Sequence, residues 1–405
     1  MAQLAASKES IGTGRYRARH FAALPSVAEA LALLDEIAAA TPDFATVPVD
    51  MPLVLYGAGN LGQMAREFLA EVGRDFDFVI DRNADVLSEH PLWRDRPVYA
   101  PDAVPSYLKQ SHLVLVTVVT APYVPLEAML DDLGFAHIAP FYDFAENFRA
   151  VHSLSNGWHA PPLPEADRQQ TANVLSGFAD DASRAHHLQF LAWRQLRQEW
   201  LFDGTVVANH NRFFIPEVLD ALASDPVFVD GGAHHGSVSL AVDGLRPDWR
   251  QIVAVEPDTD NRAVLEKTFH DHWPDGDRTR IIGDALGSAP GEARFHSGLG
   301  YASQISPIGQ NTVTLTTLDA LDIQPTFVKL HLEGGELDAL RGSLETFRRA
   351  RPIIAATVYH NADGIWKTPL WLMESLRDYR ILFRTHSWCG TGAVVYAIPD
   401  EITNM

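Results

Sequence analysis

One stretch near the middle of the chain constrains the fold more than any other. An apolar run, residues 226–229, leads into a glycine-rich turn, residues 230–236, and a helix-like segment follows the turn. A second apolar run, residues 251–255, ends in Glu256. Strand, glycine-rich turn, helix and second strand, closed by an acid, are typical of a nucleotide-binding βαβ unit. The pattern therefore predicts an α/β fold built on a parallel sheet.

The composition of this turn indicates which nucleotide binds. Glu256 follows Gly236 by 256 − 236 = 20 positions, a spacing at which a carboxylate accepts hydrogen bonds from ribose hydroxyls. The first turn residue is Asp230, where a dinucleotide site has glycine and holds a pyrophosphate over the helix N-terminus. A carboxylate repels pyrophosphate but suits S-adenosylmethionine, which has no phosphate and has a cationic end. The turn favours a methyltransferase site, and a dinucleotide site with an unusual first residue is the alternative.

A second glycine motif lies near the N-terminus. Residues 57–62 form a complete Gly-x-Gly-x-x-Gly with Gly57, Gly59 and Gly62. An apolar run precedes it, a helical pattern follows, and the next apolar run ends at Asp81, 81 − 62 = 19 positions after the last glycine. This arrangement predicts a second Rossmann-like sheet that binds NAD or another nucleotide. The alternative is a nucleotide-type fold that binds nothing tightly and serves in assembly.

Local patterns predict two further helical regions. Apolar residues recur at helical spacing over residues 26–40, and Ser26 is placed to cap the helix. Residues 168–203 also have helical spacing, and a proline-rich stretch at 161–164 precedes them as a linker.

Composition excludes several classes of function. The chain has 52 acidic and 32 basic residues, a formal charge of −20, which disfavours nucleic acid and anionic membrane surfaces as partners. The single cysteine, Cys389, cannot form an internal disulfide. The first residues lack an apolar core, and no stretch reaches the ~18 apolar residues of a membrane span. We expect a cytoplasmic protein that does not enter a membrane.

Several ordered motifs carry a resemblance to a known family. Residues 228–236 match a motif close to FVDxGAnxG, Glu256-Pro257 an EP dipeptide, residues 317–319 a tLD element, and residues 329–336 a KIDVEGxE motif. With these motifs, residues 213–399 resemble the FkbM-type S-adenosylmethionine-dependent methyltransferases. The resemblance implies a class I methyltransferase fold, S-adenosylmethionine as cofactor, and O-methylation of a hydroxyl on a small molecule, sugar or polyketide-like acceptor.

The resemblance also divides the chain and assigns the cofactor site. We expect an N-terminal Rossmann-like domain at 1–150, a linker and helical segment at 151–212, and the methyltransferase domain at 213–405. The residues expected to contact S-adenosylmethionine are Asp230, Gly232, Ala233, His234, Gly236, Glu256 and Asp284. Two positions depart from the family pattern: His234 replaces the usual Asn, and His331 replaces the family's Asp.

Three residues are candidates for catalysis. We expect His360, which follows a strand, to act as general base on the acceptor hydroxyl, with Glu333 orienting acceptor or base and His331 nearby. The three could instead hold a divalent metal, but they come from two strands without a helical HxxxH spacing, so no metal is predicted. Other classes stay open: a non-catalytic nucleotide-binding or assembly protein, or an NAD-dependent oxidoreductase using the N-terminal domain. Self-association also stays open.

Overall fold

The computed structural model describes residues 16–41, 47–154 and 162–401. The chain forms two compact units. The first comprises the residues up to 163 together with 184–209 and 385–391, and the second comprises 164–183, 210–384 and the residues from 392 on. The segment 151–212, expected as a linker with helices, is thus shared between the units.

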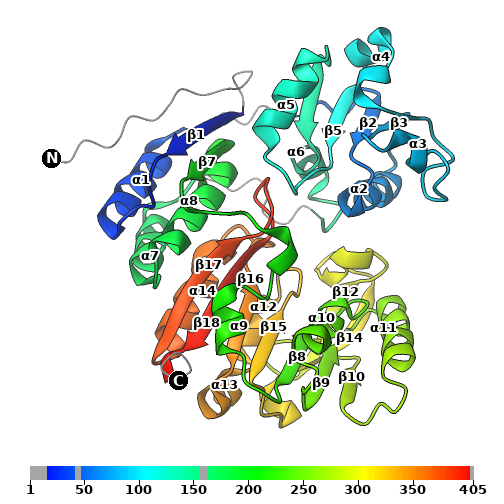
Figure 1. Cartoon of the computed structure of the whole chain (residues 1–405). Coiled ribbons are helices and arrows are strands. Elements are labelled where there is room, and N and C mark those ends of the chain that lie inside the picture. Colours follow the sequence, from blue (N-terminus) through cyan, green and yellow to red (C-terminus); the bar gives the residue numbers. More distant parts are fainter. Residues whose placement is uncertain (1–15, 42–46, 155–161, 402–405) are drawn as a thin grey trace. The chain divides into compact units, whose positions relative to one another are not determined.

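The first unit contains a five-stranded parallel sheet in the order β4-β3-β2-β5-β6 (Figure 1). Its elements are β1 (Arg17–Phe21), α1 (Val27–Ala39), β2 (Leu53–Tyr56), α2 (Asn60–Glu71), β3 (Phe78–Ile80), α3 (Ala84–Leu87), β4 (Val98–Tyr99), α4 (Ser106–Ser111), β5 (Leu113–Val116), α5 (Tyr123–Asp132), β6 (His137–Pro140), α6 (Phe141–Ala145) and β7 (Gln198–Phe202). The expected helix at 26–40 is confirmed as α1, because Ser26 and Glu29 form a reciprocal capping box.

One stretch that was expected to be helical forms a strand of a small second sheet in this unit. Residues 168–203 were expected to be helical, and most of them form α7 (Glu165–Gly177), which belongs to the second unit, and α8 (Asp181–Leu196). Residues 198–202, however, form β7, which pairs in parallel with β1. The ring of Phe202 stacks on that of Phe21, 4.3 Å between centroids. A partner strand far away in sequence therefore overrides the local helical pattern.

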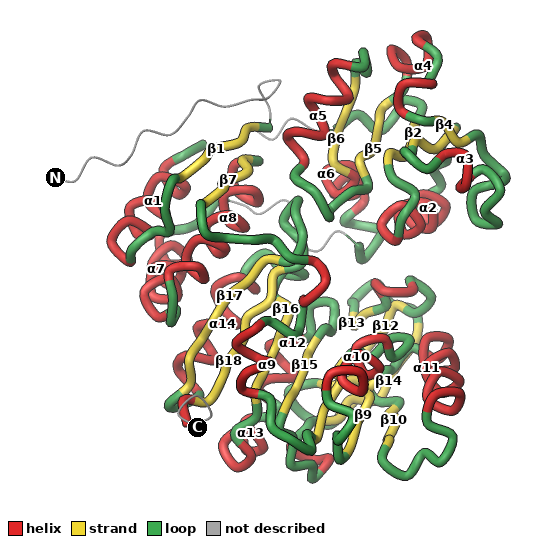
Figure 2. The backbone as a smooth tube through the Cα atoms, viewed as in Figure 1, coloured by secondary structure: helices red, strands yellow, loops and turns green. Residues whose placement is uncertain are grey.

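The second unit is built on a seven-stranded sheet in the order β10-β9-β8-β15-β16-β18-β17. Figure 2 shows these strands running between helices. Its elements are α9 (Pro216–Ala221), β8 (Val227–Gly231), α10 (Ser237–Leu245), β9 (Gln251–Val255), α11 (Thr259–His272), β10 (Thr279–Ile282), β11 (Ala285–Leu286), β12 (Gly291–His296), β13 (Gln304–Ile305), β14 (Asn311–Thr316), β15 (Phe327–Leu330), α12 (Glu336–Arg341), α13 (Leu344–Ala350), β16 (Ile353–Thr357), α14 (Gly364–Ser375), β17 (Tyr379–Thr385) and β18 (Ala393–Pro399).

The register of this sheet positions the candidate site. The strands from β10 to β16 are parallel, and Asp230 pairs with Ala254 of β9 and Lys329 of β15. The central strands are apolar and buried on both faces, as expected of a covered parallel sheet. Their carboxyl ends therefore meet at one edge, where the turn after β8, Glu256 and His331 all lie. The sheet is mixed and not wholly parallel, because β18 runs antiparallel to β16.

A four-stranded sheet, β11-β14-β12-β13, lies in the same unit and supplies further residues to the site. Strands β12 and β14 pair antiparallel over residues 291–295 and 311–315. Among the described residues, no helix combines the length and apolarity that crossing a membrane requires.

Candidate active site

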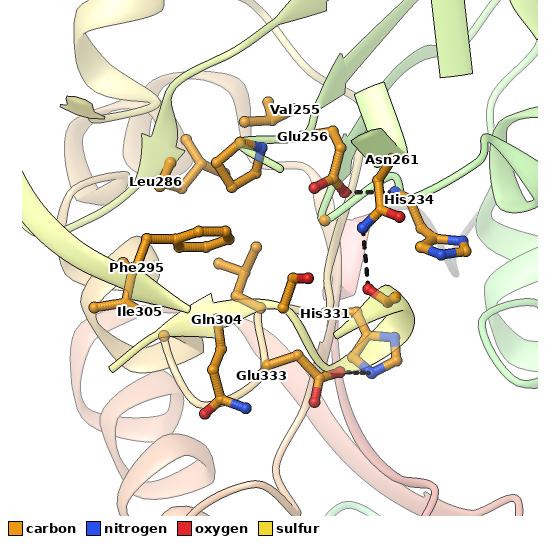
Figure 3. A pocket seen from close by; sticks show the side chains of 17 residues that line it. His234, Val255, Glu256, Asn261, Leu286, Phe295, Gln304, Ile305, His331 and Glu333 are labelled. Carbon is orange, nitrogen blue, oxygen red and sulfur yellow. Dashed lines mark hydrogen bonds and ion pairs between the residues drawn. The ribbon is translucent and has the colours of Figure 1, made fainter. Parts of the chain in front are cut away.

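A pocket that is partly open to solvent lies at the carboxyl ends of β8, β9 and β15. In Figure 3 the apolar side chains of Leu286, Phe295 and Ile305 gather on the left, and polar groups of Glu256 and Asn261 lie on the right. The residues that line it are Gly232, His234, Val255, Glu256, Pro257, Asn261, Ala285, Leu286, Phe295, Gly300, Ser303, Gln304, Ile305, His331, Leu332, Glu333 and Gly335. A concave site with an apolar wall and a few converging polar groups is typical of a small-molecule site.

The glycine-rich turn after β8 forms one wall of the pocket. Gly232 has φ = +71°, and a Cβ atom there would lie 1.9 Å from the backbone oxygen of His331. The N–H groups of Gly232 and Ala233 both donate to the carbonyl of Val255, at 2.9 and 3.0 Å. Gly236, at φ = +86°, ends the turn against Leu265 and Phe269 of α11. These contacts fix the turn, and only glycine fits at position 232.

His234 is the turn residue whose side chain lines the pocket. It is half-buried with φ = +49°, and its ring stacks on that of His235, with centroids 3.6 Å apart. Burial, together with the neighbouring His235 and Lys329, lowers the pKa of His234 to about 4. Its imidazole is therefore neutral at physiological pH.

Asp230 lies beneath the turn and does not line the pocket. Its side chain is fully buried and forms an ion pair with the buried Lys329, 2.8 Å between Oδ1 and Nζ. The hydroxyl of Ser239 donates to the other carboxylate oxygen, also at 2.8 Å. Lys329 donates in addition to the carbonyls of Gly231 and Gly232. In this arrangement the expected cofactor contact of Asp230 is replaced by an ion pair that holds the turn.

Glu256 ends β9 and places its carboxylate in the pocket (Figure 3). One oxygen accepts the N–H of His234 at 2.7 Å, and the other accepts the N–H of Asp258 at 3.0 Å. Burial raises the pKa of Glu256, and the two backbone hydrogen bonds oppose this shift. Since a carboxylate offers about four acceptor positions, each oxygen keeps one for a ligand.

His331 and Glu333 form the opposite end of the site, directly after β15. The Nε2 atom of His331 lies 3.0 Å from Oε1 of Glu333 and 3.0 Å from the hydroxyl of Tyr359. Glu333 has φ = +50°, a conformation that costs energy in a residue other than glycine. Burial and the nearby Arg212 guanidinium lower the pKa of His331 to about 3.

His360 lies behind Glu333 and does not line the pocket. Its Nε2 atom is 3.3 Å from Oε2 of Glu333, and its Nδ1 atom is 3.1 Å from Oε1 of Glu336. Burial alone would lower the pKa of His360, but Glu333, Tyr359 and Glu336 raise it well above the usual value. The structure brings the three predicted catalytic residues together, but it places Glu333 between His360 and the pocket. Direct proton abstraction by His360 stays a prediction that this arrangement does not favour.

The sequence missed part of the pocket. Asp284 is half-buried between β10 and β11 and does not line it, whereas the neighbouring Ala285 does. Phe295 and Gln304, from the four-stranded sheet, form a wall that no motif indicated. Asn261 also lines the pocket, and its amide donates to the carbonyl of Gly300 at 3.0 Å. An aromatic residue and an amide in β-rich sequence have no local pattern that assigns them to a pocket.

The N-terminal glycine motif lines a separate pocket in the first unit. Gly57 and Gly59 lie in its wall with Asp81. Gly62 is packed instead, since a Cβ atom there would lie 2.2 Å from the carbonyl oxygen of Gly57. The Asp81 carboxylate accepts the N–H groups of Ala58 and Asn83, both at 2.9 Å. Asp81 thus binds a backbone donor of the glycine loop itself, and a nucleotide at this pocket stays a prediction.

Comparison with known families identifies the domain type of the second unit. Residues 230–383 match the model of the methyltransferase FkbM domain. The chain carries an FkbM methyltransferase domain. The matched residues include the turn after β8, Glu256, and the His331, Glu333 and His360 cluster. The resemblance in the sequence motifs is therefore confirmed.

One solved structure supports the same fold. The crystal structure of methyltransferase FkbM from Methylobacillus flagellatus KT is similar with a TM-score of 0.61 and 17% identity, over 91% of this chain and 98% of that one. Precorrin-6y C5,15-methyltransferase from Geobacter metallireducens GS-15 gives a TM-score of 0.28 and 16% identity, over 49% of this chain and 95% of that one. Among curated proteins, no match was found. The predicted α/β fold is confirmed, and the FkbM domain has a class I methyltransferase fold.

Proposed function

We propose that this FkbM protein is an S-adenosylmethionine-dependent methyltransferase that acts on a hydroxyl oxygen of a small molecule, such as a sugar or a polyketide-like compound. The observation that carries the proposal is the carboxylate of Glu256. It ends β9 inside the pocket, is held by two backbone N–H groups, and keeps an acceptor position on each oxygen. Two adjacent ribose hydroxyls are the donor pair that fits such a carboxylate.

The rest of the pocket agrees with this cofactor. Leu286, Phe295 and Ile305 offer an apolar wall against which an adenine ring would pack. The turn residues Gly232 and His234 lie beside Glu256, where the amino acid part would bind. No phosphate needs to be accommodated next to the Asp230 and Lys329 pair, in agreement with a nucleoside that lacks one.

The reacting end would lie toward His331 and Glu333. Methyl transfer requires the acceptor oxygen, the methyl carbon and the sulfur in line, with the reacting atoms about 3–3.5 Å apart. We propose that Glu333 orients the acceptor, because its carboxylate faces the pocket while His360 holds it from behind. His360 is then a positioning residue, in place of the direct base expected from the sequence.

Replacing Glu256 with alanine should weaken the binding of S-adenosylmethionine roughly 10- to 150-fold, because a hydrogen-bonded charged group contributes about 1.5–3 kcal/mol. Isothermal calorimetry on wild type and variant measures this change. The control is Glu266→Ala, which removes an exposed acid of α11 outside the pocket and should leave affinity unchanged. Equal affinity in wild type and Glu256→Ala would exclude this site, and tight binding of NAD alone would favour the oxidoreductase alternative.

The affinity should also depend on pH through Glu256. Only its ionised form accepts both hydroxyl protons, and burial raises its pKa above the ordinary 4.5. Binding is therefore complete at neutral pH and is lost as the pH falls through the raised pKa, earlier than for an exposed glutamate. Calorimetry of S-adenosylhomocysteine binding at decreasing pH should show this loss in wild type and not in Glu256→Gln. An acidic loss of the same size in both proteins would assign the effect to another group.

A further inference from the structure

We propose that His331, Glu333 and His360 form a binding site for one divalent transition-metal ion of the zinc class, at the acceptor end of the pocket. One nitrogen or oxygen atom from each residue can be chosen so that all three lie within 4.8 Å of one another. Two imidazoles and one carboxylate are a ligand set of catalytic zinc sites and of other first-row metal sites. Hard cations such as Mg²⁺ prefer sites made of oxygen ligands.

The separations between these atoms suit a metal site. Oε1 of Glu333 lies 3.0 Å from Nε2 of His331, and Oε2 lies 3.3 Å from Nε2 of His360. An ion with bonds of about 2.0–2.2 Å holds neighbouring ligand atoms roughly 2.9–3.5 Å apart. The two imidazole rings are nearly parallel, with centroids 5.1 Å apart.

The Nε2 atom of His360 is buried and faces the carboxylate of Glu333 with poor hydrogen-bond alignment. Nε2 of His360 makes no well-aligned hydrogen bond among the described residues, its charged neighbour is Oε2 of Glu333 at 3.3 Å, and the side chain is 3% exposed. On the other side of the ring, Nδ1 lies 3.1 Å from Oε1 of Glu336. Binding of a metal ion would displace the Nε2 proton of His360, and the carboxylate that accepts the Nδ1 proton would then support the ring, as is usual for a metal-binding histidine.

Glu336 is itself held firmly in this supporting position. Its carboxylate accepts the N–H groups of Leu332 and Gly334, both at 3.0 Å, and the hydroxyl of Thr357 at 2.6 Å. The first two hydrogen bonds shape the loop that carries His331 and Glu333. One side chain thus positions all three candidate ligands.

The surrounding charges permit a cation. The carboxylate of Glu333 interacts electrostatically with the guanidinium of Arg212, which donates to the Tyr359 hydroxyl at 2.6 Å. The phenol stands between Arg212 and His331, since its oxygen is 3.0 Å from Nε2 of His331. Binding of an ion would replace this last contact with a metal–nitrogen bond.

The site is open on the pocket side, because His331 and Glu333 line the pocket. Three protein ligands with an open position are typical of a catalytic metal, which lowers the pKa of a bound hydroxyl. On the proposed function, the acceptor hydroxyl would bind there and release its proton to water. Its oxygen would form the bond to the methyl carbon, the carbon–sulfur bond would break, and its electron pair would stay on sulfur in S-adenosylhomocysteine. The change from the family's Asp to His331 supplies one of the nitrogens.

Metal titration of chelator-treated, full-length protein tests the site. Calorimetry with Zn²⁺ and visible absorption with Co²⁺ should each show one ion per chain in wild type. His331→Gln and His360→Gln should abolish this event, and Glu336→Gln should weaken it about 10- to 100-fold. His270→Gln, an exposed histidine of α11, is the control and should bind as wild type does. Thermal unfolding without metal checks that each variant is folded. If a histidine variant does not fold, the isosteric Glu336→Gln variant still tests the site.

Two results would overturn the site: no stoichiometric binding by wild type, or equal binding by wild type and a folded His360→Gln variant. In either case the cluster is an ion-pair network of imidazole and carboxylate groups. Binding of S-adenosylhomocysteine, measured on the same metal-free samples, separates the two proposals. If it persists without metal binding, only the metal site fails. If metal binds and the nucleoside does not, only the proposed function fails.

Discussion

Replacing Lys329 with methionine is expected to lower the free energy of unfolding by about 3–5 kcal/mol, because it leaves a buried carboxylate without its partner. Asp230 and Lys329 are both almost completely buried, and the ammonium group also binds the carbonyls of Gly231 and Gly232. Methionine keeps much of the side-chain volume but removes the charge and all three hydrogen bonds. Urea unfolding of wild type and variant measures the loss.

The second substitution that tests this ion pair is Asp230→Asn. In the double variant Asp230→Asn/Lys329→Met no buried charge remains, and the amide can still bond to Ser239. We therefore expect the double variant to be more stable than Lys329→Met alone. Destabilisation equal to the sum of the two single effects would show that the two side chains act independently.

Replacing Gly232 with alanine is the other change with a large expected effect. An alanine at φ = +71° costs roughly 1–2 kcal/mol, and its Cβ atom would meet the backbone oxygen of His331 at 1.9 Å. Because a backbone atom cannot rotate away, the turn after β8 or the end of β15 must shift, at a further cost of about 1–3 kcal/mol. We expect lower stability and at least about tenfold weaker binding of S-adenosylhomocysteine, since the shift moves both walls of the pocket.

Gly244→Ala is the matched control for this substitution. Gly244 lies in α10 with no atom within 4 Å of its virtual Cβ position, so alanine should stabilise the helix by about 0.5–1 kcal/mol. Urea unfolding and calorimetry on both variants provide the comparison. If Gly232→Ala behaves like Gly244→Ala, the close approach of the turn to His331 does not shape the pocket.

Local patterns account for the features that the sequence predicted correctly. The strand and turn over residues 227–236, with Glu256 after the next strand, follow from glycine conformation and apolar runs within one βαβ unit. The cap at Ser26 depends on a residue only three positions away. His331 and Glu333 were placed near the site because parallel strands end at one edge of their sheet.

Features that depend on distant partners could not be predicted. The pairing of Asp230 with Lys329, and of β7 with β1, joins residues far apart in the chain. Phe295 and Gln304 form one wall of the pocket. Predicting this wall from the sequence would require knowing how the smaller sheet packs against the larger one. The position of Glu333 between His360 and the pocket depends on its left-handed backbone conformation. A glutamate in this loop gives no sequence signal for that conformation.

The crystal structure of the complex with S-adenosylhomocysteine tests the central claim most directly. The account predicts one molecule per chain, with both ribose hydroxyls bonded to Glu256, the adenine beside Phe295, and the sulfur turned toward His331 and Glu333. A nucleoside bound elsewhere, or with its sulfur turned away from His331 and Glu333, would contradict it.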